Sequence, residues 1–81
     1  RTNNPRVGEY LEIKHQRKGT FFIQVTSVSD EWIDGVIVHG TAKAVMQYNV
    51  KEEGESISCR RSLCWFYPVK PAMFQQRESA Q

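Results

Sequence analysis

The alternation of side-chain character between Thr20 and Val28 constrains the fold of this chain more than any other feature. Successive side chains of a β-strand point to opposite faces of a sheet, and aromatic and β-branched residues are enriched in strands. The run therefore predicts a strand with one apolar face rather than a helix. The apolar face consists of Phe21, Ile23 and Val25, and the opposite face of Phe22, Gln24 and Thr26.

Shorter alternating runs predict further strands, separated by turns that contain glycine or charged residues. These runs cover residues 10–15, 32–38, 43–50, 55–61 and 65–69. In the first of them Leu11 and Ile13 share a face. Gly35 lies inside the run 32–38, where it predicts a bulge or a sharp bend. The run 43–50 is the most ambiguous, because residues 42–47 also suit a helical turn.

The length of 81 residues allows one domain with one modest core. A 40% hydrophobic and 25% charged composition is typical of globular domains and excludes global disorder. We expect a loose lead-in over residues 1–7, a folded domain over 8–69, and a tail over 70–81 that forms a short helical turn or is disordered. The predicted fold class is all-β, a small barrel of five to six strands.

The pattern from Gly8 to Val69 resembles the Sm-like and SH3-like small barrels. In the Sm-like pattern an opening glycine precedes an alternating strand, a glycine turn, a long strand and an acidic turn, and a late short strand carries an arginine. Gly8, Gly19, Asp30 and Arg60-Arg61 stand at those places. The chain departs from the pattern at Ile33-Asp34, where that family has an asparagine, and at Arg61-Ser62, where it has arginine-glycine. SH3-like relatives, including Tudor modules, fit about as well.

Several classes of protein are not expected. Cys59 and Cys64 are too few for a disulfide scaffold, and their spacing without a second pair is no zinc motif, so we expect two reduced cysteines in or near the core. No apolar run reaches the length of a membrane span and no leader pattern is present, which favours a soluble, cytoplasmic protein. His15 and His39 have no spacing that indicates catalysis, so we expect neither an enzyme nor a cofactor or metal.

Basic residues concentrate in two places, although the net charge is only +2. One is the end of the first strand with its following turn, and the other is an adjacent arginine pair. Flexible cations at such positions reach phosphates without being buried. The alternative is a solvated turn for the first group and a structural ion pair with Glu12 or Asp34 for one arginine. The candidate nucleic-acid ligands are Lys14, His15, Arg17, Lys18, Arg60 and Arg61, with Phe22 and Trp32 as stacking surfaces.

The aromatic residues also support a rival function. Tyr10, Phe22 and Trp32 lie opposite the apolar face, so they are candidates for contacting a protein instead of a base. The sequence thus predicts a non-enzymatic module that binds RNA or DNA with little sequence specificity, or else an adaptor or small inhibitor of the kind mobile elements encode. Strand edges at residues 10–15 or 65–69 would allow pairing into a homo-oligomer in either case.

Overall fold

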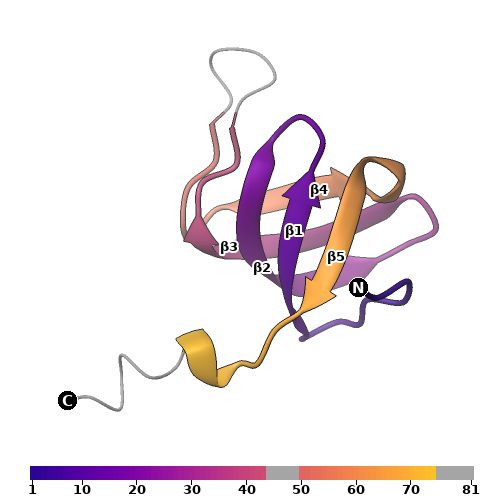
Figure 1. Ribbon diagram of the computed structural model, residues 1–81, viewed down its shortest axis with the longest axis horizontal. Helices are drawn as coiled ribbons and strands as arrows, with labels where there is room; N and C mark the ends of the chain where they lie inside the picture. Colours follow the sequence, from indigo (N-terminus) through magenta and orange to yellow (C-terminus); the bar gives the residue numbers. More distant parts are fainter. Residues whose placement is uncertain (44–49, 75–81) are drawn as a thin grey trace.

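A computed structural model describes residues 1–43 and 50–74, and the predictions for residues 44–49 and 75–81 lie outside this range. The strands are β1 (Tyr10–His15), β2 (Gly19–Val28), β3 (Trp32–Gly40), β4 (Ser56–Arg60) and β5 (Cys64–Pro68). A 3₁₀ helix, η1 (Arg61–Leu63), joins β4 to β5. All pairings are antiparallel, in the order β4-β3-β2-β1-β5 (Figure 1). The all-β prediction is confirmed.

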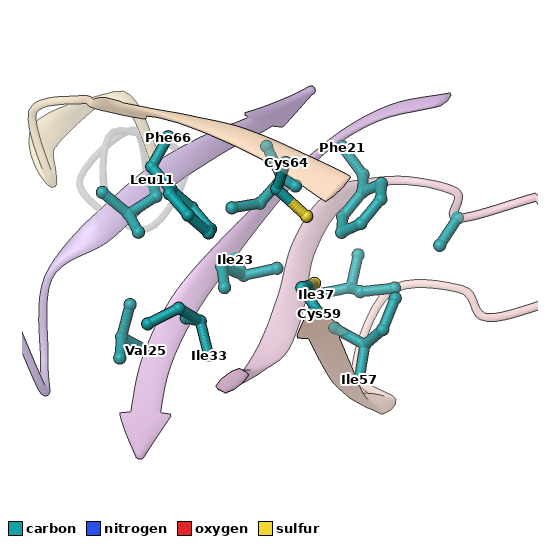
Figure 2. Close-up of a cluster of buried hydrophobic side chains, with 12 residues drawn as sticks. Leu11, Phe21, Ile23, Val25, Ile33, Ile37, Ile57, Cys59, Cys64 and Phe66 are labelled. Atoms are coloured by element: carbon teal, nitrogen blue, oxygen red, sulfur yellow. The ribbon is translucent and has the colours of Figure 1, made fainter. Parts of the chain in front are cut away.

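The core is built from the alternating faces that the sequence predicted. Strand β2 lies at the centre of the sheet, where Ile23 is opposite Leu11 of β1 and Ile37 of β3. The predicted face of β2 and its neighbours on β1 are buried, together with side chains from β3, β4 and β5 (Figure 2). The cluster contains Leu11, Ile13, Phe21, Ile23, Val25, Ile33, Ile37, Ala42, Ile57, Cys59, Cys64 and Phe66.

The bulge predicted at Gly35 is present, but the extra residue belongs to β2, the strand that pairs with β3 at this position. The β2–β3 register shifts between Val25 and Ser27, opposite Gly35 and Asp34. A Cβ atom on Gly35 would lie 2.6 Å from the Gln24 carbonyl oxygen. Only glycine lets β3 approach β2 so closely, and a bulge of this kind increases the local twist of the sheet.

One of the two predicted strand edges is present in the sheet and the other is not. Strand β1 is paired on both sides, by β2 and β5, so the prediction of a free edge at Tyr10–His15 is wrong. Strand β5 is an edge as predicted, and the Thr2 N–H donates a hydrogen bond to the Phe66 carbonyl there (2.8 Å). The other edge is β4. Within the described residues β4 and β5 do not pair, so the hydrogen-bonded sheet is open.

The structure also describes the residues that flank the segment 44–49 and the first residues of the C-terminal tail. Ala42 and Lys51 form an isolated antiparallel bridge at the base of the segment 44–49. After β5, the Phe74 N–H donates to the Pro71 carbonyl (2.9 Å), which makes the helical turn foreseen for the start of the tail.

Candidate nucleic-acid interface

The turn between β1 and β2 is organised by His15, which is buried. Its Nδ1 accepts hydrogen bonds from the backbone N–H groups of Arg17 (3.0 Å) and Lys18 (3.2 Å). Gly19 completes the turn with a positive φ of 84°. Burial, and then the positive charges of Lys18 and Arg17, lower the pKa of His15. A neutral His15 therefore holds the turn in shape, and the side chains of its neighbours extend into solvent.

The fold brings two further lysines to this turn. The Lys43 N–H donates to the Lys18 carbonyl (2.9 Å), and Lys51 lies next to Lys43 through its bridge with Ala42. We call Lys14, Arg17, Lys18, Lys43 and Lys51 the basic end. Lys14, Arg17 and Lys43 are exposed, and the other two are half-buried. The sequence analysis did not select Lys43 and Lys51, because only strand pairing brings them close to Lys18.

A polar hollow of about 480 Å³ opens beside the basic end. Lys18 and Lys51 both line it, although they come from different segments of the chain. Hydroxyl groups of Thr26, Ser56 and Ser58 and the carboxylate of Asp34 complete its polar lining. The hollow thus offers several hydrogen-bond donors and a net positive charge.

Trp65 stands next to the basic end on the outer face of the sheet. It is directly opposite Lys14 in the β1–β5 pairing and remains 37% exposed. The Lys14 Nζ lies 5.4 Å from the centre of the Tyr67 ring, on the same face. Alternation with Cys64 and Phe66, which are buried, could have identified Trp65 as outward-facing, but Trp65 was not among the predicted aromatic surfaces.

Both side chains of the arginine pair are engaged within the chain. The Arg60 guanidinium lies 4.7 Å from the Trp32 ring centre and 3.3 Å from Glu31 Oε1. Glu31 is thus the acid, in place of the expected Glu12 or Asp34.

Arg61 is half-buried, and its side chain forms hydrogen bonds to two other segments of the chain. Its Nη1 donates to the Ser29 carbonyl and its Nη2 to the Asn3 carbonyl, both at 2.8 Å. Because Arg61 belongs to η1, these bonds tie the β2–β3 turn and the N-terminal segment to the connection before β5.

Two of the predicted aromatic surfaces are covered from within the chain. Phe74 stacks on Tyr10 with ring centres 5.3 Å apart and packs against Phe22 at 5.6 Å. His39 meets Phe22 edge-on at 5.7 Å. Ring surface that stacking on a base would use is therefore occupied by the turn that follows β5.

The histidines are not assembled with other groups into a reaction centre in the described part of the chain. His39 is exposed and lies 3.8 Å from Glu53, while His15 is opposite Cys64 in the β1–β5 pairing. Within residues 1–43 and 50–74, no three His, Cys, Asp or Glu side chains are grouped to hold a metal ion. Over the same residues no helix is long and apolar enough to cross a membrane.

Comparisons with known proteins found no matching family model, no matching curated protein and no matching solved structure.

Proposed function

We propose that this protein is a non-enzymatic module that binds single-stranded nucleic acid through the basic end and Trp65. The observation that carries the proposal is the convergence of Lys18, Lys43 and Lys51 from three separate segments, together with Lys14 of the same basic end opposite the exposed Trp65. Cations from one turn alone are common on protein surfaces. Cations gathered by tertiary structure around a hollow with hydroxyl groups suit a polyanion.

The proposed chemistry has two parts. Lysine and arginine side chains neutralise phosphates and release counterions, and the hydroxyls of the hollow donate further hydrogen bonds to phosphate oxygens. Trp65 offers a ring face on which an unpaired base stacks, an interaction worth about 1–3 kcal/mol per base. Neither part reads a base edge, so we expect weak sequence preference and a preference for single strands over duplexes.

We also propose that the open sheet curves into a small barrel of the SH3-like or Sm-like kind. The strand order β4-β3-β2-β1-β5, the 3₁₀ connection before β5 and the bulge opposite Gly35 support this architecture. The side chains of Cys59 and Cys64 belong to one buried cluster although β4 and β5 are the two edges of the sheet, as a curved sheet requires. Nuclear Overhauser effects between side chains of β4 and β5 other than the two cysteines test whether the sheet curves into a barrel. The absence of such effects would refute the barrel.

Fluorescence anisotropy with labelled single-stranded RNA, single-stranded DNA and duplex DNA tests the function. If three phosphates are neutralised, affinity for a single strand should fall by roughly 20-fold between about 50 and 200 mM salt. Arg17→Glu/Lys43→Glu should abolish binding, because it replaces two exposed cations of the basic end with anions that repel phosphates. Trp65→Ala should weaken binding by about tenfold, the loss of one stacked base.

Two control variants make this experiment specific. Lys70→Glu changes the charge in the same sense at an exposed position next to Val69, whose N–H bonds to Tyr10 at the far end of β1, and should leave affinity within about twofold. Trp32→Ala removes the other exposed tryptophan and should also have little effect. No binding at low salt, or equal losses in test and control variants, would refute the proposal.

A second candidate function is a protein-interaction module, which the outer edge of β4 favours. Among the described residues no strand pairs with that edge, so its backbone groups are available to an added strand. Binding of this kind depends on backbone hydrogen bonds and apolar contacts and is far less sensitive to salt. A partner whose binding survives Arg17→Glu/Lys43→Glu but is lost on substituting Ser58 with proline would favour this function.

A further inference from the structure

Cys59 and Cys64 come from the two opposite edges of the sheet and lie in the same buried cluster of the core. Cys59 ends the buried part of β4, and Cys64 begins β5 after the single turn of η1. The pKa of each thiol is shifted by the other, so the two thiols are neighbours within this cluster. Both are free thiols among the core side chains (Figure 2). A disulfide needs two thiols that the fold brings together in this way.

The two thiols differ in how they meet solvent. Cys59 is fully buried, whereas Cys64 is 8% exposed and lines a hollow of about 110 Å³. The other lining residues are Arg1, Thr2, Asn3, Arg61 and Phe66. The hollow is large enough for a molecule of two heavy atoms, because a water molecule takes about 30 Å³ in the liquid.

The two thiols also differ in acidity. The hydrogen bond from Cys59, aided by the positive charge of Lys18, lowers the pKa of Cys64 despite its partial burial. The same hydrogen bond, together with burial, raises the pKa of Cys59. Cys64 is therefore the thiol that ionises first, and Cys59 retains its proton.

We propose that Cys59 and Cys64 form a reversible disulfide when the protein meets a hydroperoxide such as hydrogen peroxide. The Cys64 thiolate attacks one peroxide oxygen, the O–O bond breaks, and the departing hydroxide takes up a proton to leave as water. Cys64 is then a sulfenic acid. The Cys59 sulfur attacks the Cys64 sulfur, the S–O bond breaks, and the released hydroxide takes the Cys59 proton and leaves as a second water. The two thiols are oxidised by two electrons and the peroxide is reduced.

The bond would join β4 to β5 covalently, where no backbone pairing joins them. It would also close the short segment around η1 that carries Arg61. Oxidation thus links the two edge strands next to Arg61, whose side chain bonds to Ser29 and Asn3. This proposal does not depend on whether the basic end binds nucleic acid. A small-molecule thiol reverses the step by thiol–disulfide exchange.

The test treats the folded full chain with hydrogen peroxide at pH 7 and maps the products by mass spectrometry. We expect a Cys59–Cys64 peptide that has lost two hydrogen atoms and regains them with dithiothreitol. Met73 is 58% exposed and gains one oxygen atom, which reports that the peroxide reached the protein. Oxidation of Met73 with both thiols unchanged, or overoxidation of Cys64 without a disulfide, would overturn the proposal.

Single variants separate the roles of the two thiols, provided circular dichroism finds them folded. Cys59→Ser keeps a hydrogen-bond donor beside Cys64 but removes the resolving thiol, so it should accumulate the Cys64 sulfenic acid, which dimedone traps. Cys64→Ala should leave Cys59 unmodified, because it is fully buried. Should either variant unfold, brief alkylation of the unsubstituted protein gives the same information: Cys64 must be labelled before Cys59, and the reverse order contradicts the mechanism.

Discussion

At the scale of single residues, Gly35 determines how closely β2 and β3 approach. An added Cβ would meet the Gln24 carbonyl oxygen at 2.6 Å and the Ile23 Cδ1 at 2.8 Å. The first of these atoms belongs to the backbone and moves only with the strand. A side chain at position 35 therefore does not fit unless β2 and β3 move apart.

Replacing this glycine should destabilise the fold. We expect Gly35→Ala to lower the free energy of unfolding by about 1–3 kcal/mol, the usual result of overpacking a dense core. Urea denaturation followed by circular dichroism measures the change. Ser58→Ala, at an exposed position on the neighbouring β4, should stay within about 0.5 kcal/mol. Equal stability of Gly35→Ala and the unsubstituted protein would mean that β2 and β3 lie farther apart.

His15 links folding to pH through the turn that presents Arg17 and Lys18. Its pKa in the folded protein lies below the ordinary value of 6.5, because burial and the two cations oppose a charged ring. The unfolded chain then binds more protons than the folded chain as pH falls below 6.5. The stabilisation is fully present above that pH and decreases as pH falls toward the folded-state pKa.

Urea midpoints between pH 8 and pH 5 test this linkage. The unsubstituted protein should lose stability over the acidic part of that range. His15→Asn keeps an acceptor for the two backbone N–H groups without a titrating ring, so its profile should be flatter. His39→Gln replaces an exposed histidine and should follow the unsubstituted protein. A profile for His15→Asn as steep as that of the unsubstituted protein would contradict the assignment.

At the scale of elements, the strands were predictable where alternation is local and strong. Residues 20–28 and 10–15 were assigned with nearly the observed bounds, and the side chains expected to be buried are buried. The pairing partners of each strand depend on contacts distant in sequence, which alternation does not encode. For this reason β1 was expected to offer an edge, and the place of Phe74 against Tyr10 and Phe22 was not foreseen.

The turn after β5 should contribute measurably to stability through Phe74. Removing the ring in Phe74→Ala should cost roughly 1 kcal/mol or more, since two aromatic contacts are lost together with buried area. Met73→Ala alters the preceding, largely exposed side chain and should change stability by less than about 0.5 kcal/mol. Thermal melts of both variants provide the comparison. Indistinguishable melts would place Phe74 away from Tyr10 and Phe22 in solution.

At the scale of the whole molecule, the proposed interface is an assembly that only the fold creates. The sequence indicated the cations of the β1–β2 turn, because they are adjacent in the chain. It did not indicate Lys43 and Lys51, which reach Lys18 through a hydrogen bond and a bridge between separate segments. Arg60 was selected for its charge, yet its guanidinium rests on Trp32 beside Glu31. Charge can be read from sequence, but its pairing requires the tertiary structure.

The two tryptophans allow the location of binding to be measured directly, because each contributes one indole N–H signal to a ¹⁵N–¹H NMR spectrum. Titrating the protein with a short single-stranded RNA at low salt should shift the Trp65 indole signal and the amides of the β1–β2 turn. The Trp32 indole should stay in place, since it lies at the start of β3 with Arg60 on its ring. Shifts confined to Trp32 or to β4, or no shifts at all, would contradict the assignment of the basic end and Trp65 as the nucleic-acid interface.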